Sequence, residues 1–325
     1  MMKKLKRNLT IGLALAVGLY FVMGLYADFP SLAEAFRSFS WQYFPIALGL
    51  VFVNYLIRFI KWEYLIRVLD IRIPAVPSFV IFMSGLTMTI SPAKMGEVMK
   101  SFLLKDYRDV PVSRSSPVIV AERATDVIGV VILGSAGTLA YGFGREVLAI
   151  TIVLMALFIT IIQIRSLCFR LIHLAERLPL IRRFAHHFEE FYESAYVLLK
   201  ARHLVPTVIL STAGWFFECL AAYVCLRGLA MDIALPLVMF IFVISSLAGA
   251  LAMIPGGLGV AEGSMTGLLV ANGFGKDIAV AGTLLIRLAT FWFAILLGLI
   301  GLSLYGLIPG GGAVDGLENH AVEEN

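Results

Sequence analysis

A glycine-rich break separates two apolar runs at Ile254-Pro255-Gly256-Gly257-Leu258-Gly259-Val260-Ala261-Glu262-Gly263. Residues 233–254 before it are almost entirely apolar, and residues 264–272 after it are apolar or small. Proline lacks an N–H group and glycine tolerates positive φ, so one helix is expected to end here and another to begin. Inside a bilayer, freed backbone groups are tolerated only where protein or a water-filled cavity satisfies them. The segment is therefore predicted to be the tip of a re-entrant hairpin that lines a cavity.

An earlier stretch has the same plan. Ser91-Pro92-Ala93-Lys94-Met95-Gly96-Glu97 also lies between apolar runs, with a proline, a glycine four residues later and then a glutamate. The similarity continues on both sides at a nearly constant offset, which is 160 residues from Arg67 to Arg227 and 164 residues from Arg123 to Arg287. Because self-similarity at a steady offset is a signature of transporter folds, an internal repeat is predicted.

The composition identifies the class of protein. The 325-residue chain is 60% hydrophobic and 15% charged, and its mean hydropathy is +0.90. Soluble domains carry about 25% charged residues, so this is an all-α polytopic membrane protein. Cys168, Cys219 and Cys225 have neither metal-ligand nor disulfide spacing and are expected to be apolar filler. No metal site, cofactor or nucleic-acid partner is predicted.

The positions of Lys and Arg predict the topology, because these residues concentrate in cytoplasmic loops. About six full spans are predicted, at roughly 9–27, 41–66, 116–141, 146–163, 204–226 and 277–306. A short external loop is expected over 28–40. The segment 75–105 has arms of about 15 and 10 residues, too short for two spans of about 20 residues each. It is predicted to be a re-entrant hairpin from the cytoplasm, with a second hairpin, 236–272, entering from outside.

This topology inverts one repeat relative to the other. Residues 1–308 are expected to form a single transmembrane domain, with repeat one at about 41–163 and repeat two at about 204–306. The basic segment 165–203 is predicted to be a cytoplasmic linker with an amphipathic helix, either at the membrane interface or solvated. The tail 309–325 is predicted to be disordered and cytoplasmic. The N-terminus is also predicted to be cytoplasmic. The two hairpin tips should then meet near the midplane.

Ionisable residues inside spans are functional hypotheses, because each costs about 2.5–3.5 kcal/mol on insertion. Ten positions qualify, five basic and five acidic: Arg58, Lys94, Glu97, Lys100, Glu122, Arg123, Asp126, Glu218, Glu262 and Arg287. This balance also favours mutual pairing in a structural network. Arg58 is expected to snorkel to the inner interface, where Lys61 lies in the basic end of the second span.

The repeat selects among these positions. Glu97 and Glu262 follow the tips at matched places, and Arg123 and Arg287 follow on the next helices. A helix that starts after a tip offers unpaired N–H groups to an anion, and arginine adds a fork suited to phosphate oxygens. The glutamates could hold the arginines or titrate and couple transport to protons. The predicted binding set is Arg123, Arg287, Lys94, Glu97, Glu262, Glu122, Asp126, Gly96, Gly256, Gly257 and Gly259.

Three motifs carry a family resemblance. The two tips and Ala121-Glu122-Arg123-Ala124-Thr125-Asp126 resemble, in order and spacing, the transmembrane region of lysylphosphatidylglycerol synthases and their stand-alone flippase-like relatives, over roughly residues 10–306. In two-domain members this region is held to move an aminoacylated phospholipid between leaflets, while a soluble C-terminal domain makes that lipid. This sequence ends about 20 residues after its last predicted span. The resemblance therefore implies translocation without aminoacyl transfer.

The resemblance implies a flippase of the cytoplasmic (inner) membrane, and its substrate would be a phospholipid or a polyprenyl-phosphate-linked lipid with an anionic or phosphate-containing headgroup. Alternatives are an ion-coupled carrier of a small anion, a lipid-modifying membrane enzyme, and a non-catalytic partner of a lipid-synthesis enzyme. The sequence has no nucleophile paired with a base, no HExxH motif and no P-loop, so no enzymatic activity is predicted. Proton or cation coupling and homo-oligomerisation stay open.

Overall fold

The computed structural model describes residues 2–91, 96–141, 145–165 and 185–309, and within these ranges every regular element is a helix. The predicted all-α class is confirmed. The first half of the described chain comprises α1 (Met2–Ala27), α2 (Phe29–Ser38), α3 (Tyr43–Val68), α4 (Ala75–Gly85), the 3₁₀ turn η1 (Leu86–Ile90), α5 (Met99–Arg108), α6 (Val112–Tyr141) and α7 (Arg145–Gln163). The second half comprises α10 (Ala185–Leu198), α11 (Ala201–Gly228), α12 (Leu235–Leu251), the 3₁₀ turn η3 (Pro255–Gly257), α13 (Val260–Ala271), α14 (Lys276–Arg287), the π-turn η4 (Leu288–Trp292) and α15 (Phe293–Tyr305).

Among the described residues, three helices are long and apolar enough to cross a membrane by themselves. They are α3, α11 and the continuous run Lys276–Tyr305. The helices Gly12–Ala27 and Phe29–Ser38 pass the same test as a pair bent by 95°. The 30-residue α6 is also long, but its middle carries Glu122, Arg123 and Asp126. The predicted total of six spans therefore stays a prediction.

Residues 28–40, expected to be a loop, instead contain α2, so that expectation was wrong. Pro30 stands in the first turn, where a missing N–H removes no helical hydrogen bond. Leu32, Ala35 and Phe39 then bury one face at helical spacing. This short periodicity was present in the sequence but lies in a segment too polar to resemble a span.

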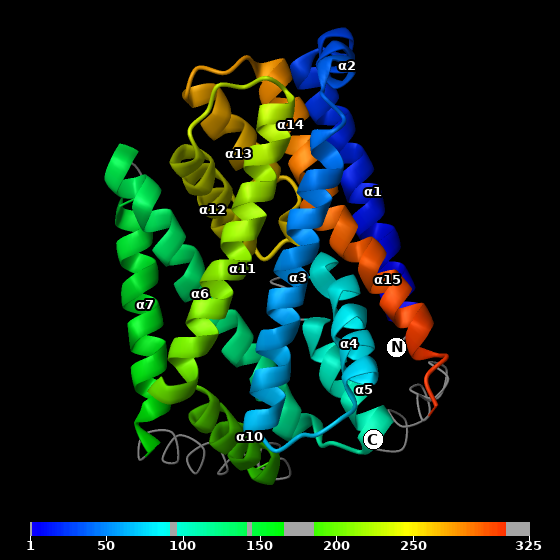
Figure 1. The fold of residues 1–325 in the computed structure, drawn as a ribbon, viewed down its shortest axis with the longest axis vertical. Coiled ribbons are helices and arrows are strands. Elements are labelled where there is room, and N and C mark those ends of the chain that lie inside the picture. The colour runs from blue at the N-terminus through cyan, green and yellow to red at the C-terminus, as the bar shows by residue number, and fades with distance from the viewer. Residues whose placement is uncertain (1, 92–95, 142–144, 166–184, 310–325) are drawn as a thin grey trace.

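The central helices α3 and α11 pack side by side and run in opposite directions (Figure 1). They end in nearly the same geometry. Leu69 has φ −92° and ψ 14° and is followed by Asp70 at φ 56°, while Leu229 has φ −88° and ψ 13° and is followed by Ala230 at φ 56°. In both, the next amide donates to a carbonyl five residues back, at 3.0 and 3.2 Å, which satisfies an orphan carbonyl at the helix end.

The opposed directions of α3 and α11 send the segments that follow them to opposite ends of the molecule. Figure 1 shows α4 and α5 at the level of the lower half of α3, and α12 and α13 at the level of the upper half of α11. The turns η1 and η3, which end the first arm of each hairpin, contact each other near the middle. The central residues 92–95 of the first tip lie outside the described residues.

The last helix fixes the first hairpin by close backbone packing. A Cβ atom on Gly298 would lie 2.2 Å from the backbone nitrogen of Thr87, and one on Gly301 would lie 2.7 Å from that of Ser84. Glycines allow such approaches between membrane helices, where van der Waals packing replaces the hydrophobic driving force. The helix α10 packs against α6 and buries Ala195 and Leu198, so its apolar face covers protein.

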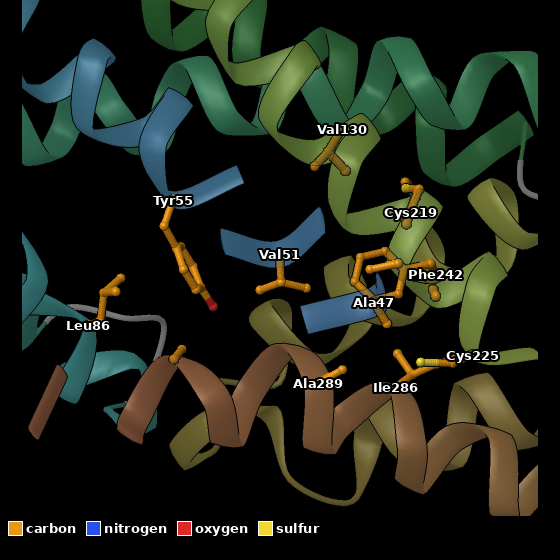
Figure 2. Close-up of a cluster of buried hydrophobic side chains, with 14 of the residues drawn as sticks. Ala47, Val51, Tyr55, Leu86, Val130, Cys219, Cys225, Phe242, Ile286 and Ala289 are labelled. Atoms are coloured by element: carbon orange, nitrogen blue, oxygen red, sulfur yellow. The ribbon is translucent and has the colours of Figure 1, made fainter. Parts of the chain in front are cut away.

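The apolar core lies where α3, α6, α11, α12 and α14 meet (Figure 2). Ala47 and Val51 of α3 lie opposite Ile286 and Ala289 of the last span, and Cys219 and Cys225 are buried among them. These two cysteines behave as the expected filler, and Cys168 lies outside the described residues. This core holds the central helices at fixed separations beside the charged groups described next.

Candidate functional site

A cavity of about 280 Å³ lies between the central helices and the second hairpin tip. It receives residues from α3, η1, α6, α11, α12, η3 and the last span. Its charged and hydroxyl-bearing lining includes Tyr55, Arg58, Arg123, Asp126, Glu218 and Arg287. Its apolar wall includes Val130, Trp215, Phe242 and Phe291. The cavity thus combines a hydrophobic wall with three arginines and two carboxylates.

Asp126 of α6 is the centre of a buried ion cluster. Lys61 Nζ lies 2.6 Å from its Oδ1, and Ser211 of α11 donates to the same oxygen at 3.0 Å. Arg123 Nη2 lies 3.0 Å from the other carboxylate oxygen, and Arg58 Nη2 lies 3.9 Å from it. One carboxylate therefore connects α3, α6 and α11 at the depth of the cavity.

Glu97, just past the first tip, faces three cations, one each from α3, α5 and α6. Arg123 lies at 3.2 Å, Lys100 at 3.6 Å and Arg58 at 3.8 Å from its carboxylate. Lys100 also donates to Glu122, which is fully buried, and its ammonium lies over the Trp62 ring at 4.6 Å. Burying charges is costly unless they are paired, and here each carboxylate has at least one cation within 4 Å.

Arg287 occupies the matching place in the second half and is held at three points. Its Nε donates to Glu262 Oε1 at 2.6 Å, its Nη2 donates to the carbonyl of Gly256 at 2.8 Å, and its guanidinium lies 4.2 Å from the Phe291 ring centre. The π-turn η4 begins at the next residue, and such turns frequently mark functional sites. Arg287 thus joins the last span to the hairpin tip.

Glu262 lies in the first turn of α13 and is completely buried. Its Oε2 accepts a hydrogen bond from the Gly259 amide at 2.8 Å, while its Oε1 accepts from Arg287. A carboxylate in the first helical turn satisfies a free N–H group and complements the helix dipole. Of the two roles considered for this glutamate, holding the arginine in place is the one that these contacts describe.

The second tip requires glycine at three positions. Gly256, Gly257 and Gly259 have φ values of 64°, 64° and 89°, a region that costs other L-residues roughly 1–2 kcal/mol. At Gly257 space is also lacking, because an added Cβ would lie 3.1 Å from the backbone of Gly249. At Gly259 the nearest atom would be 3.9 Å away. The predicted break in the helix is confirmed.

Gly257→Ala is therefore expected to lower the melting temperature more than Gly259→Ala does. Both changes place a side chain at positive φ, but only the first forces α12 and the tip apart. The matched control is Gly263→Ala, in a helix with open space around it, which should be neutral or slightly stabilising. Thermal unfolding of the three purified variants in one detergent measures the order. Equal losses for the two tip variants would contradict the packing argument at Gly249.

The structure brings together most of the predicted binding residues. Arg123, Asp126, Gly256, Gly257 and Arg287 line the cavity. The carboxylates Glu97, Glu122 and Glu262 lie behind the arginines or Lys100, outside the cavity lining. Gly96 binds the Ser91 hydroxyl through its amide at 2.8 Å, Gly259 shapes the backbone without lining the cavity, and Lys94 lies outside the described residues.

Two cations were misjudged from the sequence. Lys61, expected at the basic inner end of its span, is completely buried against Asp126. Arg58, expected to snorkel, has only 8% of its side chain exposed and lines the cavity. A usable signal existed, because Asn54, Arg58 and Lys61 recur at four- and three-residue spacing and so share one helix face. A polar stripe on one face of a span predicts burial inside the bundle.

The chemistry of the site is that of ion pairing. Within the described ranges, no group of three or more His, Cys, Asp or Glu side chains could hold a metal ion. The charged groups described above comprise five cations and five carboxylates when Glu218 is included. At the cavity wall, an arginine of this cluster can exchange its contact with a carboxylate for a contact with an incoming anion.

Comparison with known proteins gives one family and several relatives. The family model of the lysylphosphatidylglycerol synthase TM region matches residues 9–298. A UPF0104 membrane protein of Methanothermobacter thermautotrophicus is 23% identical over 304 residues, which are 85% of this chain and 89% of that protein. A UPF0104 membrane protein of Pyrococcus horikoshii is 26% identical over 289 residues, or 79% and 85% of the two chains. The names of these relatives give a membrane location and no reaction.

Proposed function

The chain belongs to the family of the lysylphosphatidylglycerol synthase TM region, and from that premise we propose that it is a lipid flippase. It is an integral, multi-pass membrane protein, and its proposed substrate is a lipid with an anionic or phosphate-containing headgroup. The observation that carries the proposal is that Arg123 and Arg287 line the same cavity. These two arginines follow the two hairpins at matched places in the chain. No catalytic step is proposed.

The headgroup would enter this cavity while its tails stay in the bilayer. An unpaired phosphate in hydrocarbon is strongly unfavourable, whereas guanidinium groups supply charge-assisted hydrogen bonds at any depth. Trp215 and Phe242 offer an apolar wall for the first carbons of the tails. Leu251 and Met253, next to the second tip, expose apolar side chains that are suited to contact with lipid.

We propose that the two halves of the chain form an inverted repeat and that this repeat underlies the mechanism. The opposed, similarly terminated helices α3 and α11 and the hairpins at opposite ends of the molecule are the arrangement expected for alternating access. Rocking one half against the other would open the cavity first to one leaflet and then to the other. We place the protein in the cytoplasmic membrane with both termini inside, because Lys and Arg cluster in the segments assigned to that side.

Proteoliposomes test the proposal. Acyl-labelled phosphatidylglycerol should cross between leaflets faster than in protein-free vesicles, while acyl-labelled glucosylceramide, which lacks a phosphate, should not. A parallel arm measures uptake of radiolabelled inorganic phosphate. Uptake of inorganic phosphate without lipid movement would favour the small-anion carrier, and movement of both lipids at equal rates would contradict recognition of the headgroup.

A further inference from the structure

We propose that Arg58 and Arg123 together form a binding site for the phosphate group of the headgroup, called here the paired-arginine site. This inference rests on the proposed function and adds a residue that the repeat does not single out. Both side chains line the cavity. Both also approach the same two carboxylates, Glu97 and Asp126, within 4 Å, so the two guanidinium groups lie beside each other.

The contacts of Arg58 leave its donors unused. Its closest carboxylate oxygens are 3.8 and 3.9 Å away, beyond hydrogen-bond distance. Its Nε is buried and has no hydrogen-bond partner among the residues that the structure describes. Buried arginine donors normally find acceptors, so an arginine that lines a cavity and has an unpartnered donor is a candidate for contact with a ligand that supplies the acceptor.

Arg123 shows the same property. Its Nη2 lies 3.0–3.2 Å from two carboxylates, but neither contact has hydrogen-bond geometry, and its Nε is also without a partner in the described part of the chain. With 26% of the side chain exposed, it is the most open of the three arginines at the cavity. Two adjacent guanidinium groups with free N–H bonds can direct several donors at one phosphate.

Arg287 differs from this pair. Glu262 and the Gly256 carbonyl occupy its Nε and Nη2, and Phe291 covers one face. These contacts show that Arg287 positions the second tip, while its residue also lines the cavity. The paired-arginine site is therefore the stronger anion contact in this conformation. Glu97 and Asp126 orient its two arginines and keep them from repelling each other when no ligand is bound.

Calorimetric titration of the purified protein in a neutral detergent tests the site. The probes are short-chain phosphatidylglycerol, inorganic phosphate and an uncharged short-chain glycolipid. Arg58→Ala should weaken phosphatidylglycerol binding about tenfold or more, the scale of one lost charge-assisted hydrogen bond, and Arg58→Lys should weaken it less. Arg37→Ala, which removes an exposed arginine from α2, should leave binding unchanged.

A charge-balanced variant separates binding from packing. If Arg58 merely neutralised Glu97, Arg58→Gln combined with Glu97→Gln would restore wild-type affinity, and the proposal would be overturned. If Arg58→Lys bound phosphatidylglycerol with wild-type affinity, the planar guanidinium group would not be needed, and the proposed two-point contact by Arg58 would be overturned. If the Arg58 variants weakened the binding of inorganic phosphate but not of phosphatidylglycerol, the site would be reassigned to a soluble anion. Arg58-dependent lipid binding without translocation would leave the paired-arginine site standing and reject the flippase.

Discussion

Arg123→Ala is expected to slow lipid translocation about 10- to 100-fold while the protein still folds. The loss corresponds to about one charge-assisted hydrogen bond to the moving phosphate, worth about 1.5–3 kcal/mol. Arg123 is the most exposed arginine at the cavity, and its contacts with Glu97 and Asp126 lack hydrogen-bond geometry. Arg123→Lys keeps the charge but loses the planar fork, so it should retain part of the activity. Leaflet exchange of labelled phosphatidylglycerol in proteoliposomes measures both.

The competing explanation is that Arg123 only pairs with nearby carboxylates, as its position one turn from Asp126 allows. Removing Asp126 is a poor control, because Asp126 also holds Lys61. Arg123→Gln with Glu97→Gln is better, since Lys100 keeps Glu122 as a partner. Transport restored to wild-type rates in this double variant, at normal expression, would show that Arg123 serves the ion cluster and not the substrate.

Lys100→Met is expected to give the largest loss of stability, about 3–5 kcal/mol in the free energy of unfolding. The loss is expected because Glu122 is a fully buried carboxylate, and Lys100 is its ion-pair partner within the described residues. Without the ammonium group, a buried charge would keep no cation within 4 Å among the residues that the structure describes. Unfolding in mixed micelles measures the change, and Lys105→Met, an exposed position on the same helix, is the matched control.

A second change should reverse most of this loss. Lys100→Met combined with Glu122→Gln removes both charges and leaves a neutral amide, which costs much less to bury than a carboxylate. Its stability should return to within about 1–2 kcal/mol of the wild type by that reasoning. If the double variant were as unstable as the single one, the destabilisation would come from lost packing of the lysine chain on Trp62.

The local features of the fold were predictable because they depend on neighbouring residues. Pro255 and the glycines of the second tip break the helix through their own backbone preferences, and the structure has the break where the sequence placed it. The Arg123–Asp126 pair also follows from helical spacing. The contact between Lys61 and Asp126 does not, because it joins residues 65 positions apart and depends on how α3 packs against α6.

The depth of a charged residue in the bundle was the harder quantity to predict. Composition placed Arg58 and Lys61 at the end of a span, but only the packing of α6 and α11 against that face of α3 buries them. The matched positions of Arg123 and Arg287 likewise suggested equal roles. The structure gives them unequal partners, because only Arg287 meets a tip carbonyl and an aromatic face.

Photo-crosslinking from inside the cavity can show whether a lipid headgroup binds there. The photoreactive amino acid benzoylphenylalanine would replace Phe242 at the cavity wall, and in a matched control it would replace Phe52, an exposed residue of α3. After irradiation in membranes, mass spectrometry identifies the attached molecules. We predict that position 242 captures lipids enriched in phosphate-bearing headgroups relative to position 52, and that Arg123→Ala abolishes this enrichment. The same lipid composition at both positions, or capture of no lipid at position 242, would contradict the account.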